Sequence, residues 1–192
     1  MRIKADHKHS HDIYELARVI FPNKEITMVE QDYRIDSQLF EDKVKTSFID
    51  KDIFNEVYLS DFKVFKDLGN WESKLLKYSF YNLFKDENQL AWGMLTGIRP
   101  EKLARQIGEI YGNPREILEK YFFLSSEKAN LLTDIYKVQK PFIDKYKDGY
   151  SLYINIPFCP SVCSYCSYRV LPSNKYKNFI KPYVEKLIEE IK

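Results

Sequence analysis

The chain has three cysteines, and all of them lie in one short stretch, FCPSVCSYC, residues 158–166. Cys159, Cys163 and Cys166 follow the spacing C-x3-C-x2-C. Zinc usually takes four nitrogen or sulfur ligands, and the histidines that could complete such a set lie far upstream, in HKHSH at residues 7–11. Three thiolates on a tight loop suit an iron–sulfur cube better, because they hold three irons and leave the fourth open to another ligand.

Two other interpretations of the cysteines remain open. A redox pair formed by Cys163 and Cys166 leaves Cys159 unexplained. A structural zinc site would need a fourth ligand from the upstream histidines or from a partner chain. The alternative to an enzyme is therefore a non-catalytic module that carries either an iron–sulfur cluster or zinc.

A strand and a helix are expected to hold this loop. The stretch SLYINI, residues 151–156, alternates side chains as a strand does, so that Tyr153 and Asn155 share one face. Residues 176–191 carry apolar side chains along one stripe of an amphipathic helix, in which Pro182 is expected to cause a local bend. A strand, a loop and a helix form the first βα unit of a parallel architecture, in which reactive groups gather at the carboxyl ends of strands.

The first part of the chain predicts a mixed α/β region. A strand is expected over residues 2–8, a helix over 12–20, and an antiparallel pair of strands over 26–36 and 43–49. A helical block follows over residues 71–147.

Several residues predict where the helices of this block begin and end. Pro100 suits the first position of a helix, and Pro141 is expected to end or kink the last one. Ser125 or Ser126 is expected to cap that last helix. The apolar residues of the Pro100 helix are expected on one side, and they are Leu103, Ile107, Ile110 and Tyr111.

A polar link, KYKDGY at residues 145–150, marks the expected domain boundary. The prediction is therefore an α/β chain with an N-terminal α+β and helical domain over 1–147. A second part over 148–192 would contain the strand, the cysteine loop and the first helix of a larger domain.

Two stretches carry a resemblance to a known family. YINIPFCPSVCSYCSY, residues 153–168, resembles the start of radical S-adenosylmethionine (SAM) enzymes, and in particular the oxygen-independent coproporphyrinogen III oxidase/dehydrogenase family. AWGMLTGIRPEKLARQIGE, residues 91–109, is similar to the HemZ-like branch of that family. The resemblance implies that residues 148–192 are the start of a barrel-like radical SAM core.

The resemblance also implies a chemistry. Cys159, Cys163 and Cys166 would ligate a 4Fe–4S cluster, and SAM would chelate its fourth iron. Tyr153 matches a family tyrosine near the SAM sulfonium, and Tyr165 matches an aromatic position whose backbone lies beside the adenine. An external electron donor would reduce the cluster, and the 5′-deoxyadenosyl radical would take hydrogen from the propionates of a porphyrinogen, which lose carbon dioxide. This reaction belongs to heme biosynthesis.

The chain departs from the family pattern at two positions. Asn155 stands where the family has a histidine, and Tyr168 stands where some members have a further cysteine. These departures concern the identity of the substrate more than the radical SAM chemistry.

The remainder of a radical SAM core is expected to be missing from the chain. Only the 26 residues 167–192 follow Cys166, whereas a complete barrel takes about 250 residues. We therefore expect a truncated fragment that does not turn SAM over by itself, with an apolar stripe over 176–191 that nothing covers.

The charge balance argues against two classes of partner. The formal net charge is +2, from 30 basic and 28 acidic residues, so neither nucleic acid nor an anionic membrane is expected. Residues 103–122 faintly suggest a helix–turn–helix, but DNA binding is not expected, because a near-neutral chain has little surplus positive charge to contact phosphates. An odd number of cysteines without a secretory signal predicts the cytoplasm.

Two further patterns could bind a ligand, but a structural role is favoured for each. His7, His9 and His11 could share one face of a strand and bind a metal, but a polar turn is the favoured interpretation. Arg99, at the start of its helix, could meet a substrate carboxylate, but local pairing is favoured.

Overall fold

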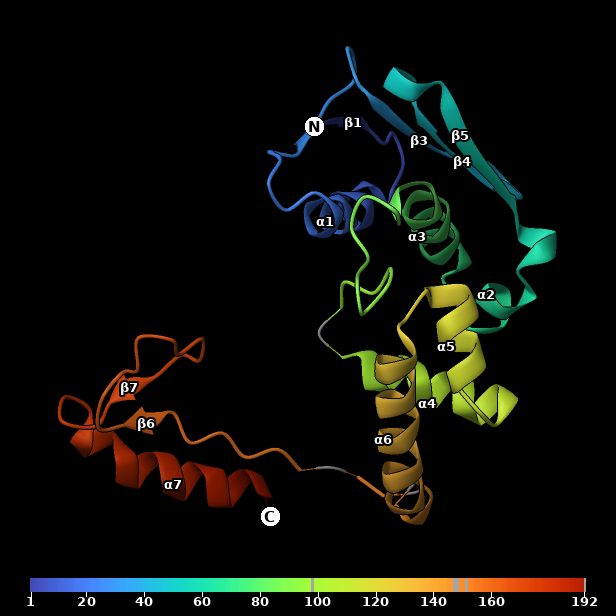
Figure 1. Cartoon of the computed structure of the whole chain (residues 1–192). Coiled ribbons are helices and arrows are strands. Elements are labelled where there is room, and N and C mark those ends of the chain that lie inside the picture. The colour runs from blue at the N-terminus through green and yellow to red at the C-terminus, as the bar shows by residue number, and fades with distance from the viewer. Residues whose placement is uncertain (98, 147–148, 151, 192) are drawn as a thin grey trace. The chain divides into compact units, whose positions relative to one another are not determined.

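The computed structural model describes residues 1–97, 99–146, 149–150 and 152–191. The chain divides into two compact units, Met1–Lys147 and Asp148–Lys192. The mixed α/β class expected from the sequence is confirmed, since both helices and a mixed sheet are present (Figure 1).

A five-stranded sheet forms the first half of the N-terminal unit, in the order β2-β1-β3-β4-β5. β1 pairs in parallel with β2 and β3, whereas β3, β4 and β5 form an antiparallel meander. The expected antiparallel pair is thus confirmed in part: β4 lies where a strand was expected, but its partner β3 shares only Ile35 and Asp36 with the strand expected over 26–36. The strands are β1 (Arg2–Lys4), β2 (Thr27–Met28), β3 (Ile35–Leu39), β4 (Lys43–Phe48) and β5 (Ile53–Tyr58).

Two details of the sheet differ from expectation. The single strand expected over 26–36 is two strands, because the chain turns between them at Asp32, whose φ is 53°. β5 was not expected, and it follows a tight turn in which Asp52 takes the left-handed conformation.

Helices α1 and α3 cover one face of this sheet (Figure 1). α1 buries Ile13, Leu16, Ala17 and Ile20, as the sequence pattern predicts, and ends at Ile20 before Phe21. The helices of the N-terminal unit are α1 (Ser10–Ile20), α2 (Lys63–Asp67), α3 (Trp71–Phe84), α4 (Pro100–Tyr111), α5 (Arg115–Phe122) and α6 (Ser126–Lys145).

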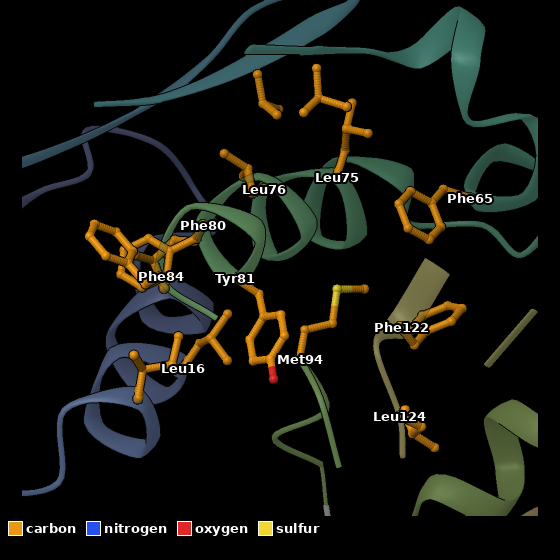
Figure 2. Packing of buried hydrophobic residues seen from close by; sticks show 14 of the residues in the cluster. Leu16, Phe65, Leu75, Leu76, Phe80, Tyr81, Phe84, Met94, Phe122 and Leu124 are labelled. Carbon is orange, nitrogen blue, oxygen red and sulfur yellow. The ribbon is translucent and has the colours of Figure 1, made fainter. Parts of the chain in front are cut away.

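α3 lies at the centre of the core and buries side chains toward several elements (Figure 2). Leu75 and Leu76 point toward the strands, whereas Tyr81 points toward Met94. The ring of Phe84 packs against the rings of Phe21, Phe48 and Phe80 at centroid distances of 5.4, 5.4 and 5.0 Å. Edge-on aromatic packing of this kind adds to the free energy gained from burial.

The starts of two later helices agree with the sequence. α4 begins at Pro100, and the Ser125 hydroxyl accepts a hydrogen bond from the Lys128 N–H at 3.3 Å, which caps α6. α6 continues through Pro141 to Lys145, so the expected end at that proline is wrong.

The buried side of α4 was predicted only in part. Ile107 is buried, but Ile110 and Tyr111 are 50% and 40% exposed. The face toward α6 is instead formed by Ala104, Ile107 and Gly108, because small residues allow the two helices to approach closely. A Cβ atom on Gly108 would collide with the ring of Tyr136.

The C-terminal unit contains two short strands and one helix. β6 (Phe158–Cys159) pairs in parallel with β7 (Leu171–Pro172), and α7 (Lys177–Ile191) follows. None of the described residues of α7 is buried, although Ile180, Tyr183 and Leu187 are half-buried. The apolar stripe expected to be uncovered is therefore covered only in part within this unit.

The strand expected over 151–156 is absent, with Ser151 itself outside the described residues. Residues 152–156 have no regular secondary structure, and the side chains of Leu152, Ile154 and Ile156 are exposed. A strand needs a neighbour to satisfy its backbone groups, and the described part of this unit offers these residues none.

Candidate metal centre

A small parallel bridge closes the cysteine loop at its base. The Leu171 N–H donates to the Pro157 carbonyl at 2.7 Å, and the Ser173 N–H donates to the Cys159 carbonyl at 2.8 Å. Cys159 therefore lies within β6, at the start of a loop whose far end returns to the same backbone. This closure gives the loop two fixed ends without any buried core.

The three cysteines lie near the protein surface as free thiols. Cys163 is exposed, and Cys159 and Cys166 are partly exposed. The Cys166 N–H donates to the Cys163 carbonyl at 3.0 Å, so these two residues lie at the ends of one tight turn. The Cys166 thiol is 3.8 Å from the carbonyl of Tyr168.

Tyr183 of α7 holds the segment before the loop. Its hydroxyl donates to the Asn155 carbonyl, and its ring meets the Phe158 ring edge-on at 5.4 Å. The sequence assigns Tyr183 only to the apolar stripe of the helix. No pattern in the sequence predicts its contact with the loop, because that contact depends on where the helix returns.

The two tyrosines predicted to contact SAM are both available to a ligand. The side chains of Tyr153 and Tyr165 are 78% and 86% exposed. The expectation that Tyr153 and Asn155 share the face of a strand is wrong here, because this segment is not a strand.

The chemistry of the donor set fits an iron–sulfur cluster. The chain supplies three free thiols on one surface loop and has no fourth cysteine. In the described part of the chain, however, no three Cys, His, Asp or Glu side chains are gathered closely enough to hold a metal. The structure thus shows three thiols on one loop with a closed base. The thiols themselves are not gathered into a metal-binding arrangement.

The upstream histidines are engaged in local contacts. His9 Nε2 lies 3.1 Å from the Glu72 carboxylate and His9 Nδ1 lies 3.4 Å from Asp12. His7 Nε2 lies 3.3 Å from the Ser37 hydroxyl, and burial lowers the pKa of His7. The favoured interpretation of a polar turn agrees with these contacts.

Arg99 pairs with its own helix. Its Nε donates to the Glu101 carboxylate at 3.0 Å, which agrees with the expected local pairing and lowers the pKa of Glu101. Within the part of the chain that is described, no helix is long and apolar enough to cross a membrane.

One curated protein provides a comparison for part of the chain. The oxygen-independent coproporphyrinogen-III oxidase-like protein HemZ of Bacillus subtilis (strain 168) is 33% identical over 118 residues. The match covers 57% of this chain and 23% of that protein, so the chain spans about a quarter of the length of its relative. No protein-family model and no solved structure matches the chain. The chain is therefore similar to part of a coproporphyrinogen-III oxidase-like protein.

Proposed function

We propose that the chain carries the cluster loop of a cytoplasmic radical SAM oxidoreductase of heme biosynthesis. The reaction proposed is the oxygen-independent oxidative decarboxylation of coproporphyrinogen III to protoporphyrinogen IX, with SAM and an external one-electron donor. The observation that carries the proposal is the cysteine set Cys159, Cys163 and Cys166, which is the whole cysteine content of the chain. The similarity to HemZ supports the same assignment.

The cysteines have the role of holding the cluster. Thiolates are the ligands that iron–sulfur clusters take, and three of them leave one iron for SAM. When bound, such a cluster supplies the electron that converts SAM into a 5′-deoxyadenosyl radical. Cys163 and Cys166 are fixed to each other by their turn, and the β6–β7 bridge fixes the carbonyl of Cys159. Binding of the cluster would require the three thiols to come together within this closed loop.

The tyrosines have the role of positioning SAM. Tyr153 precedes the loop and would lie beside the sulfonium, whereas Tyr165 lies between two ligands and would place its backbone beside the adenine. Both side chains are exposed and are free to close over a ligand. Tyr183 holds the carbonyl of Asn155 and the ring of Phe158, so it orients the segment between Tyr153 and Cys159.

Anaerobic reconstitution of the 192-residue chain with iron and sulfide tests the proposal. We expect a brown protein in which iron and sulfide co-purify, with an electron paramagnetic resonance signal after reduction that changes when SAM is added. Cys163→Ala should abolish iron binding, whereas Ser164→Ala, a neighbouring change that removes no thiol, should retain it. Tyr153→Ala should bind iron but respond less to SAM.

Metal analysis separates the proposal from its rivals. Stoichiometric zinc that survives reconstitution would replace the cluster with a structural zinc site. A cluster whose resonance is unaffected by SAM would indicate a non-catalytic cluster module. Either result would contradict the proposed function.

A further inference from the structure

A cavity of about 230 Å³ lies in the N-terminal unit between α3 and the segment that leads into α4. Three cationic side chains line it: Lys74 and Lys77 from α3, and Arg99. None of its described lining residues is acidic. The rest of the wall is largely apolar and includes Met94, Leu95, Leu103 and Phe122.

Lys77 is the most confined of these cations. Its side chain is 17% exposed, and its Nζ donates to the Thr96 hydroxyl at 3.1 Å. The carboxylate of Asp12 lies 4.0 Å away and also accepts a hydrogen bond from the Ser73 hydroxyl at 2.6 Å. Burial lowers the pKa of Lys77, which means that the ammonium lacks a fully compensating anion.

Lys74 adds a second positive charge beside the first. Its Nζ donates to the carbonyls of Leu68 and Gly69, which are neutral partners. Burial and the charge of Lys77 both lower the pKa of Lys74, so the two ammonium groups repel each other across the cavity. A bound anion would relieve this repulsion.

The start of α4 adds to the positive electrostatic potential in the cavity. Arg99 is the residue before the helix, Pro100 is its first residue, and no side chain caps this end. Pro100 and Leu103, in the first turn of α4, line the cavity, so the positive end of the helix dipole lies at its border. Arg99 is 72% exposed in its side chain, so its guanidinium can swing from Glu101 toward a ligand.

We propose that this cavity binds a small organic carboxylate. The carboxylate group would lie among Lys74, Lys77 and Arg99. An apolar body would pack against the half-exposed Leu95 and Leu103, with the buried Met94 directly behind them. The apolar wall favours this ligand over inorganic phosphate, which would leave that wall without a partner. The proposal concerns the N-terminal unit alone and does not rest on the cysteine loop.

Methionine methyl resonances give a local test in the full 192-residue chain. The chain has three methionines, of which Met94 lines the cavity and Met28 lines a different one. The probes are 3-phenylpropionate and its uncharged amide, 3-phenylpropionamide, at low ionic strength. We expect the carboxylate to shift the Met94 resonance in a saturable way and to leave that of Met28 in place, and the amide to shift neither.

Charge variants then assign the site. Lys77→Gln should weaken binding of 3-phenylpropionate by about tenfold or more, because it removes a charge-assisted hydrogen bond from a confined site. Lys77→Arg should retain most of the affinity. Lys137→Gln, at an exposed lysine outside this cavity, should leave the affinity unchanged. Circular dichroism checks that each variant is folded.

Four results would overturn the proposal. They are the absence of any Met94 shift at millimolar 3-phenylpropionate, equal shifts with the amide, tighter binding of inorganic phosphate, and unchanged affinity in a folded Lys77→Gln chain. Should Lys77→Gln not fold, Arg99→Gln takes its place, because the exposed Arg99 is not needed for the core. Arg99→Gln should lower the affinity for 3-phenylpropionate about threefold, because the charge it removes is screened by solvent. An unchanged affinity would again contradict the proposal.

Discussion

Helices α3 and α7 have similar lengths and each carries an apolar stripe, yet α3 is largely buried and α7 is largely exposed. α3 has 14 residues and buries seven of them, whereas α7 has 15 residues and none of those described is buried. The difference lies in what surrounds each helix. The N-terminal unit provides a sheet, α1 and the segment around Met94 to cover α3, whereas the described C-terminal unit provides only a two-stranded bridge and the cysteine loop. An amphipathic sequence thus becomes core only where other elements offer a second apolar face.

The largest expected effect contrasts one phenylalanine from each helix. Phe84 is 1% exposed and packs against three other rings, whereas Phe179 is 62% exposed. We expect Phe84→Ala to lower the free energy of unfolding of the N-terminal unit by about 3–5 kcal/mol. Phe179→Ala should change it by less than about 0.5 kcal/mol. Urea denaturation followed by circular dichroism measures both, and similar losses would remove the contrast between the units.

The contact between α4 and α6 gives the next effect. Gly108→Ala would normally favour a helix by about 1 kcal/mol. Here the added methyl group meets the ring of Tyr136, so we expect a net loss of about 1–3 kcal/mol in the same denaturation experiment.

A double variant tests the cause of that loss. Tyr136→Ala removes the ring, so Gly108→Ala should be neutral or stabilising in that background. If the loss persists without the ring, the close approach of α4 and α6 is not what requires a glycine.

A smaller effect is expected where the C-terminal unit holds its loop. Tyr183→Phe removes the hydroxyl that donates to the Asn155 carbonyl but keeps the ring beside Phe158. The loss of one hydrogen bond, about 0.5–1.5 kcal/mol, should speed amide hydrogen exchange at Leu171 and Ser173 several-fold. Exchange in β4 should be unchanged, since it belongs to the other unit.

Tyr176→Phe serves as the control for this change. Its ring lies 6.1 Å from that of Phe179, and its loss of a hydroxyl should leave exchange at Leu171 and Ser173 unaltered. Equal acceleration in both variants would mean that Tyr183 does not anchor the loop.

The same contrast explains how much of the fold could be predicted. The buried face of α1, the start of α4 at Pro100 and the cap at Ser125 follow from local chemistry, which the sequence displays directly. The burial of Gly108 depends on the ring of Tyr136, which lies far along the chain. Residues 152–156 alternate like a strand, but alternation supplies no hydrogen-bonding partner.

The candidate site was predictable in its ligands rather than in its geometry. Spacing identifies Cys159, Cys163 and Cys166 as a set, because ligand type and sequence distance are properties of the chain itself. The contacts that hold the loop, from Tyr183 and from β7, arise when the chain returns to the segment before Cys159. The cationic cavity was missed for the same reason, since Lys74 and Lys77 line one cavity with Arg99 only when the segment before α4 comes to lie beside α3.

The smallest expected effect concerns pH and belongs to the N-terminal unit, which contains all three histidines. Burial, and then the charge of His9, lower the pKa of His7, and its buried Nδ1 has no hydrogen-bond partner among the described residues. As the pH falls below about 6.5, the unfolded chain therefore takes up a proton that the folded chain does not yet take up. The free energy of unfolding contributed by this group is fully present above that pH and is lost on acidification until the lowered pKa is reached.

Replacing His7 should flatten this dependence. His7→Gln retains a side chain that can bond to the Ser37 hydroxyl, and urea denaturation between about pH 5 and pH 7.5 should show a smaller loss of stability in acid than the unaltered chain. His11→Gln, at an exposed imidazole, should keep the original dependence. The effect is small because His7 is only half-buried. An unchanged slope in His7→Gln would contradict the assignment to His7. Glu72 would not explain such a slope, because Lys8 and His9 lower its pKa and its contribution is lost only below about pH 4.5.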